Sequence, residues 1–139
     1  MYTNNRDAYR QFFFTTWQKH EKKLLLDAAE SRLISIILKH PEYHYLFEKP
    51  EKWEHQEFDL AENPFFHMSL HYSIAEQVST DRPAGITQIK QTLSARLVDS
   101  HHAEHLMMEQ LCHMMAKAQE TGSTPGDEEY LNSLRGIAS

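Results

Sequence analysis

The sequence has little cysteine, glycine or proline, and each shortage excludes a class of structure. Its single cysteine, Cys112, cannot form an internal disulfide, so we expect a reducing compartment and a cytoplasmic protein. Four glycines and five prolines leave little material for turns, which favours helices over many short strands. The chain begins without the apolar core of a secretory signal, and no stretch approaches the roughly 20 apolar residues of a membrane span. We therefore expect no membrane partner.

Basic residues are also scarce. The chain has 14 lysines and arginines against 20 aspartates and glutamates, which gives a formal net charge of −6. Proteins that bind nucleic acids through phosphate contacts need clustered positive charge, and no stretch here supplies it. We therefore expect no nucleic-acid partner. Phosphate-binding loops, dinucleotide-binding fingerprints and paired-cysteine motifs are absent as well.

Histidine is the residue that the chain has in excess. There are ten histidines, which is about three times the usual share. Apolar residues make up 40% of the chain and charged residues 24%, as is ordinary for a globular protein. Because 139 residues is close to the length of one typical domain, we expect residues 1–139 to form a single helical domain.

Apolar residues recur along most of the chain with the 3.6-residue period of helices. The predicted helices cover about 5–20, 27–40, 64–80, 85–97, 100–121 and 127–135. A short helical piece follows Pro41, and a long connection covers 48–63. Asn4 or Asn5 would cap the first helix, and Pro64 is a specific start signal. We predict an all-α, single-domain bundle of five to six helices with mainly up-down connections.

Two of the predicted helices carry histidines on their apolar faces. In the first of them, His67 and His71 fall inside an apolar stripe that runs from Phe66 to Val78. A core would normally place leucines at such positions. The two histidines are separated by three residues, a spacing that brings both imidazoles to one side of a helix, one turn apart.

The second helix covers 100–121 and repeats this spacing. Glu104 projects from the middle of its methionine-rich stripe, while His101 and His105 lie on the shoulder of the stripe and Glu109 lies further out. A carboxylate in an apolar stripe is costly unless it is paired, protonated or bound to a cation. Imidazoles together with a carboxylate inside a helical bundle suit Fe, Mn or Zn.

Short connections make neighbouring helices antiparallel, which would place both histidine pairs at the same end of the bundle. The metal hypothesis therefore takes as ligands His67, His71, His101, Glu104 and His105. The end of the predicted helix 27–40 could reach the same end of the bundle as the two histidine pairs. Glu109 could accept a hydrogen bond from the ring of a metal-binding histidine. The further candidates are His40, His44 and Glu109.

Two hypotheses about function stay open at this point. The first is a metal-binding bundle, either a hydrolase or an oxidase, in which a metal with an open position activates water or dioxygen. The second is a non-catalytic module that binds another protein, with the same histidines and glutamates forming a structural hydrogen-bond network. The sequence is compatible with a homodimer or a protein partner. It identifies no catalytic residue, and the substrate stays unknown.

Five long strings stand out in the sequence: R-D-A-Y-R-Q-F-F-F-T-T-W, H-P-E-Y-H, N-P-F-F-H-M-S-L-H, E-Q-V-S-T-D-R-P-A-G-I and A-E-H-L-M-M-E. Together they resemble bacterial proteins grouped as domain of unknown function 1841, from about Arg6 to Arg135. The resemblance implies a small bacterial intracellular protein with no established activity. It also implies that the metal candidates have counterparts in the family pattern, whereas His102 and His113 do not.

Overall fold

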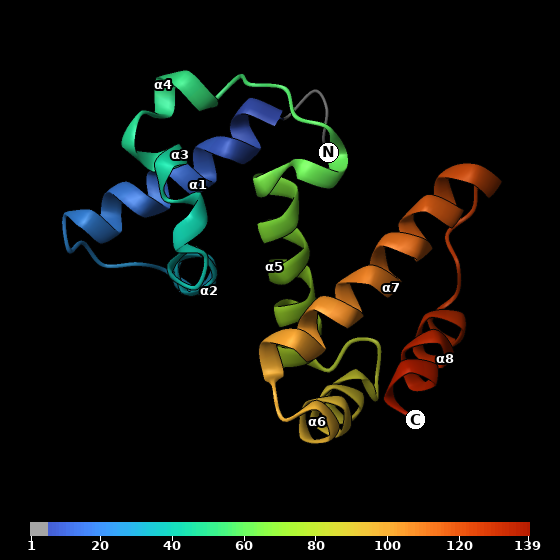
Figure 1. The fold of residues 1–139 in the computed structure, drawn as a ribbon. Helices are drawn as coiled ribbons and strands as arrows, with labels where there is room; N and C mark the ends of the chain where they lie inside the picture. The colour runs from blue at the N-terminus through green and yellow to red at the C-terminus, as the bar shows by residue number, and fades with distance from the viewer. Residues whose placement is uncertain (1–5) are drawn as a thin grey trace. The chain divides into compact units, whose positions relative to one another are not determined.

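The computed structural model describes residues 6–139, and every regular element in this part of the chain is helical (Figure 1). Its helices are α1 Arg6–Glu21, α2 Ala28–Leu38, α3 Tyr45–Glu48, α4 Pro50–Trp53, α5 Pro64–Thr80, α6 Ile86–Leu97, α7 Ser100–Thr121 and α8 Asp127–Ala138. Two 3₁₀ turns, η2 Pro41–Tyr43 and η3 Leu60–Glu62, complete the list. None of these helices combines the length and the apolarity needed to cross a bilayer.

The all-α class is therefore confirmed, but the predicted number of five to six helices is too low. The described part of the chain has eight helices. The two extra ones, α3 and α4, have four residues each. Helix α3 falls in the short helical piece predicted after Pro41, whereas α4 lies in the predicted connection 48–63 and is too short for a helical period to be recognised. The mainly up-down order stays a prediction. The predicted cap of the first helix, Asn4 or Asn5, lies outside the described residues.

The chain divides into two compact units, and the boundary falls between Tyr72 and Ser73, inside α5. Unit 1 contains α1 to α4 and the first part of α5. Unit 2 contains the rest of α5 and α6 to α8. The single domain expected from the length stays a prediction.

Unit 1 is built around an aromatic core. Helix α1 buries Phe13 and Phe14, and both rings meet Phe65 edge to face, with centroids 5.4 and 5.8 Å apart. Phe14 also meets Phe47 at 5.8 Å. Such pairs add about 0.5–1.5 kcal/mol each beyond the burial of their area. The first helix, the short helices and the start of α5 are therefore joined by aromatic contacts.

The connection between α1 and α2 is fixed at both of its ends. Asp27 caps α2 by accepting a hydrogen bond from the backbone N–H of Glu30, whose carboxylate accepts one from the N–H of Asp27 in return. Lys19 of α1 pairs with the same Glu30 carboxylate at 2.7 Å. The pKa of Glu30 is lowered first by the Asp27 backbone N–H and then by Lys19. A single carboxylate thus links the two helices.

A buried arginine holds the long connection that follows α4. The side chain of Arg10 is only 2% exposed, and its guanidinium lies 4.6 Å from the centroid of the Phe65 ring. It donates hydrogen bonds of 2.7–3.3 Å to three backbone carbonyls, those of Trp53, Glu54 and Gln56. Burial lowers the pKa of this guanidinium, which nevertheless stays charged. The connection is therefore attached to α1, as its aromatic residues led us to expect.

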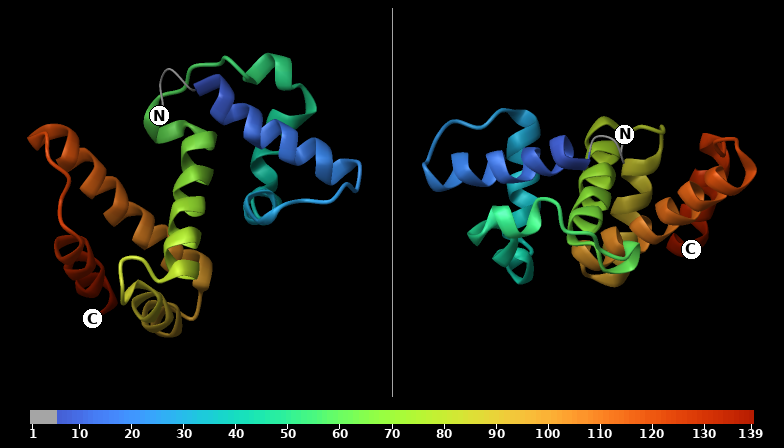
Figure 2. Two further views of the ribbon diagram at one scale, coloured as in Figure 1. Left: turned by 180° about the vertical axis from the view of Figure 1, so that it is seen from behind. Right: turned by 90° about the horizontal axis from the view of Figure 1, so that it is seen from above.

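Unit 2 has an aliphatic core in which α6, α7 and α8 lie side by side (Figures 1 and 2). The buried apolar side chains are Ile74, Ile86, Ile89, Leu93, Ala103, Met107, Met108, Tyr130, Leu131 and Leu134. Asp99 caps α7 by accepting hydrogen bonds from the backbone N–H groups of His101 and His102. Gly122 ends α7 with a φ of 76°, a left-handed conformation that glycine adopts at little cost.

Candidate metal site

Helix α5 brings two histidines together in unit 1. The side-chain oxygen of Asn63 accepts hydrogen bonds from the backbone N–H groups of Phe65 and Phe66, at 2.9 and 3.1 Å. The helix therefore begins where the sequence predicted. One turn into it, the ring centroids of His67 and His71 lie 4.8 Å apart. His71 is 2% exposed and His67 is half-buried.

The apolar stripe predicted for this helix was wrong in detail. Phe66 and Val78, which were expected to define its ends, are only half-buried, whereas Phe65 and Met68 are fully buried. Buried residues occur on more than one face of α5, so a single stripe does not describe the helix. A helix that is buried nearly all round has no strong amphipathic pattern from which its faces could be predicted.

A third histidine joins this pair from the segment that follows α2. His40 is 2% exposed, and its ring centroid lies 4.6 Å from that of His71 and 5.3 Å from that of His67. Its Nδ1 lies 2.8 Å from the backbone carbonyl oxygen of Ile36. Because a carbonyl oxygen only accepts hydrogen bonds, Nδ1 carries the proton, and in the neutral ring the lone pair is on Nε2.

We call His40, His67 and His71 the three-histidine cluster. One ring nitrogen of each residue lies within 4.8 Å of the others. Nitrogens bound to one tetrahedral zinc at about 2.0–2.1 Å are roughly 3.3 Å apart, so small ring rotations would bring the cluster to ligand spacing. The cluster could therefore hold a transition-metal ion and leave coordination positions for other ligands.

His44, one of the further candidates, lies outside the three-histidine cluster. Its Nε2 lies 2.8 Å from the carbonyl oxygen of Ile37. Its ring centroid lies 4.9 Å from that of Trp17, which in turn stacks on Phe47. His40 has surroundings of the same kind, so these contacts do not separate the two residues. Among residues 6–139, the ring nitrogens that lie within 4.8 Å of one another include that of His40 and not that of His44.

The second predicted histidine pair belongs to unit 2. The ring centroids of His101 and His105 lie 4.3 Å apart, with His101 exposed and His105 half-buried. Glu104 pairs with Lys90 of α6, with 3.2 Å between the carboxylate oxygen and Nζ. Ion pairing was one of the three ways in which this carboxylate was expected to be stabilised. That these residues share a site with His67 and His71 of unit 1 stays a prediction, and so does any role for Glu109, whose side chain is exposed.

Three other residues of α7 have surroundings that suggest no reactive role: His102, Cys112 and His113. His102 and His113 are exposed. Cys112 is half-buried. Burial, followed by the nearby charge of Glu109, raises the pKa of its thiol. A raised pKa leaves little thiolate at neutral pH, so Cys112 is a poor nucleophile.

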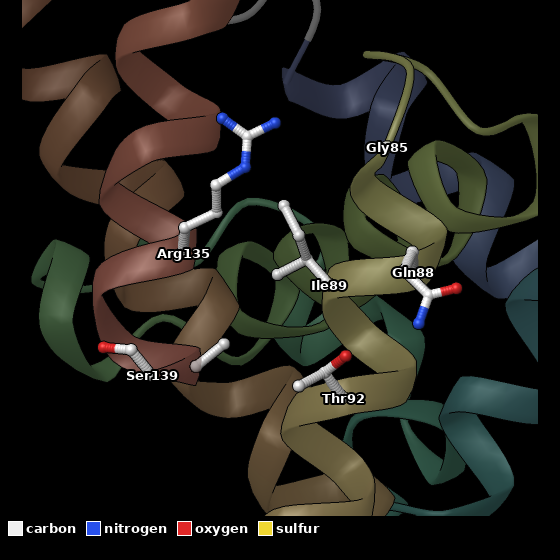
Figure 3. A pocket seen from close by; sticks show the side chains of 7 residues that line it. Gly85, Gln88, Ile89, Thr92, Arg135 and Ser139 are labelled. Atoms are coloured by element: carbon white, nitrogen blue, oxygen red, sulfur yellow. The ribbon is translucent and has the colours of Figure 1, made fainter.

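Unit 2 also contains a groove of about 390 Å³ between α6 and α8 (Figure 3). Gly85, Gln88, Ile89, Thr92, Arg135, Ala138 and Ser139 line it. The charged group among them, the guanidinium of Arg135, already donates to the side-chain oxygen of Asn132 at 2.9 Å. The groove lacks the converging titratable groups that mark a reactive site. For this reason we place the chemistry at the three-histidine cluster and not at this groove.

Sequence reasoning underrated His40 and missed Tyr43. His40 was only a further candidate because the long connection after it obscured which end of the helices it would reach. Tyr43 was not considered, although it follows His40 by three residues. Its ring is almost parallel to that of His40, with an angle of 3° and centroids 5.6 Å apart. The signal was the short turn starting at Pro41, in which residues three apart lie over one another.

The fold and the site together define an all-helical protein with a buried cluster of histidines. The chain belongs to the family described as Domain of unknown function (DUF1841), whose family model matches residues 5–136. The match covers nearly the whole chain and confirms the resemblance found in the sequence. Comparisons with curated proteins and with solved structures found no match. The function must therefore be argued from the site itself.

Proposed function

We propose that the protein binds one transition-metal ion through the three-histidine cluster. The observation that carries this proposal is the meeting of three imidazoles from two separate segments, with one nitrogen of each within 4.8 Å of the others. His40 comes from the segment that follows α2, whereas His67 and His71 come from α5. Two of the three side chains are only 2% exposed. Burying polar rings is costly unless they form hydrogen bonds or bind a cation.

The orientation of His40 supports the proposal. A histidine that binds a metal usually donates its other ring N–H to a carboxylate, a water or a backbone carbonyl, which fixes the ring and its tautomer. The Nδ1 of His40 has this partner in the carbonyl oxygen of Ile36 at 2.8 Å. The lone pair on Nε2 is then the donor that a metal would use.

The nature of the donors narrows the choice of metal. Neutral imidazole nitrogens suit Zn, Cu, Fe and Ni, whereas Mn prefers carboxylates and water. Among the metals expected from the sequence, the cluster therefore favours Zn or Fe over Mn. Three protein ligands would leave a position for a water molecule, as in metal sites that activate water. The proposal concerns metal binding and assigns no substrate.

Elemental analysis of protein purified without a histidine tag tests the proposal. We expect close to one equivalent of Zn or Fe, or one equivalent of Zn after reconstitution. Replacing His40 or His71 by Ala should abolish stoichiometric binding, whereas the matched change His113→Ala on the exposed face of α7 should leave it intact. Wild-type protein that takes up no metal, or cluster variants that keep it, would contradict the proposal.

The predicted ligands of unit 2 can be tested in the same way. If His105 is a ligand, His105→Ala should weaken metal binding as strongly as His71→Ala does. If three ligands suffice, the His105 variant should bind like wild type. Glu104→Gln is a less direct probe because it also removes the partner of Lys90. Either result leaves the three-histidine cluster as the centre of the site.

A second candidate is a non-catalytic protein-interaction module whose buried histidines and glutamates are structural. It is favoured by His44, which is held by the carbonyl of Ile37, and by the ion pair of Glu104 with Lys90. This candidate predicts a protein whose melting temperature does not change when a chelator is added. The metal-binding proposal predicts a lower melting temperature in chelator, because an ion that binds only the folded state stabilises it. We keep the expected cytoplasmic location as part of both proposals.

A further inference from the structure

We infer that Tyr43 is a positioning residue for the proposed metal ligand His40, and that its aromatic ring, not its hydroxyl group, has this role. The inference rests on the proposed metal binding. It adds a residue outside the cluster that fixes the plane of one ligand. Tyr43 is the last residue of the 3₁₀ turn η2, which begins directly after His40.

The backbone explains why the two rings lie parallel. A 3₁₀ helix has three residues per turn, so the side chains of residues i and i+3 lie over one another. Pro41 occupies the first position of η2, where the missing N–H of proline costs nothing. The N–H of Tyr43 donates to the carbonyl oxygen of His40 at 2.9 Å. The turn thus places the phenol ring over the imidazole at an angle of 3°.

The stacking leaves the His40 ring little freedom. One edge of the imidazole is held by the bond from Nδ1 to the carbonyl oxygen of Ile36. The Tyr43 ring lies parallel beside it, with ring centroids 5.6 Å apart. The hydrogen bond and the parallel ring together restrict the direction of Nε2 before any metal arrives. Preorganisation of this kind strengthens binding because less conformational freedom is lost on association.

Tyr43 also contacts a second proposed ligand. Its ring meets that of His67 edge to face, with centroids 6.0 Å apart and an angle of 73°. One half-buried ring therefore touches two histidines that come from different segments of unit 1. Replacing it with an aliphatic side chain would release His40 and remove a wall of the site. Phenylalanine would keep both contacts.

The role is assigned to the ring because the contacts that join Tyr43 to His40 and His67 are ring contacts. Tyr43→Phe removes the hydroxyl group and keeps the ring, so this variant tests whether the hydroxyl takes part.

Titration with Co²⁺ tests the inference, because the visible spectrum of bound cobalt reports the geometry of its ligands. The variants are Tyr43→Phe, Tyr43→Leu and the matched control Tyr45→Leu. Tyr45 lies two residues further along the chain, and its ring packs on Trp53 at 5.0 Å. Tyr43→Met is a second non-aromatic variant, to be used if the leucine variant does not fold. Methionine suits this purpose because its flexible side chain adapts to irregular gaps in a core.

We expect the phenylalanine variant and the Tyr45 control to match wild type in both affinity and spectrum. The leucine or methionine variant should bind Co²⁺ about tenfold more weakly, which is the usual scale for residues that orient a ligand. Its spectrum should also change, which a purely structural role would not cause. Wild-type-like binding and spectrum in the non-aromatic variants would overturn the inference alone, as would an equal loss in the phenylalanine variant. A wild-type protein that binds no Co²⁺ would overturn the proposed function and this inference together.

Discussion

The two units of the molecule differ in what they bury. Among residues 6–139, the buried polar or charged side chains are Arg10, Thr16, Glu30, His40 and His71. All of them belong to unit 1. The described core of unit 2 consists of aliphatic, methionine and alanine side chains with Tyr130. Buried polar groups must be bonded or bound to a ligand, so unit 1 is where specific chemistry is to be expected.

The largest expected effect concerns the buried arginine of unit 1. Arg10→Met keeps the apolar length of the side chain but leaves three backbone carbonyls without their donor. We expect a loss of about 3 kcal/mol in the free energy of unfolding, from the bonds to a charged donor that disappear. Denaturant titration monitored by circular dichroism measures this loss.

Arg6→Met is the matched control for that change. Arg6 lies on the same helix, but its side chain is 37% exposed and its pair with Glu57 is at the surface. Surface ion pairs contribute little. If both variants lose the same amount of stability, the polar interior of unit 1 does not have the importance that the comparison gives it.

Removing a helix cap should destabilise the two units by similar amounts. Asp27 caps α2 in unit 1, and Asp99 caps α7 in unit 2. Each change to Ala should cost about 1 kcal/mol, because each removes a side-chain acceptor from the first turn of a helix. Thermal unfolding of the two variants measures both losses. If one variant loses much more stability than the other, the units differ at their helix ends as well as in their cores.

The smallest effect at neutral pH concerns Tyr130 in unit 2. Burial raises its pKa to about 12, although its hydrogen bond to Gln77 lowers it. The unfolded chain loses this proton near pH 10.0, the ordinary value. Stability is therefore unaffected below pH 10.0 and falls as the pH rises toward about 12. Near-ultraviolet titration should show a tyrosine that loses its proton near pH 12 and that is missing in Tyr130→Phe. A wild-type protein whose tyrosines all titrate near the ordinary value would contradict this.

The sequence predicted the parts of the fold that are encoded locally. Pro64 predicted the start of α5 because a proline at the first helical position acts within a few residues of itself. The predicted helices 100–121 and 127–135 correspond to α7 and α8 because both segments have a helical period. These predictions needed no knowledge of the neighbouring helices.

The parts that depend on distant segments could not be predicted in this way. The partner of Glu104 is Lys90, which lies on another helix, so helical periodicity could not identify it. The place of His40 depended on the path of the chain through two four-residue helices. Histidine spacing found His67 and His71 and left His40 as a further candidate, and the folded structure of unit 1 brings its ring to theirs.

X-ray absorption spectroscopy of the zinc-loaded protein tests the central claim most directly, because it counts imidazoles around the metal. The account predicts nitrogen ligands at about 2.0 Å with outer-shell scattering from at least three imidazole rings. No stoichiometric zinc is expected in His71→Ala. Zinc surrounded by oxygen ligands alone, or an unchanged imidazole count in the His71 variant, would contradict a metal site built on these three histidines.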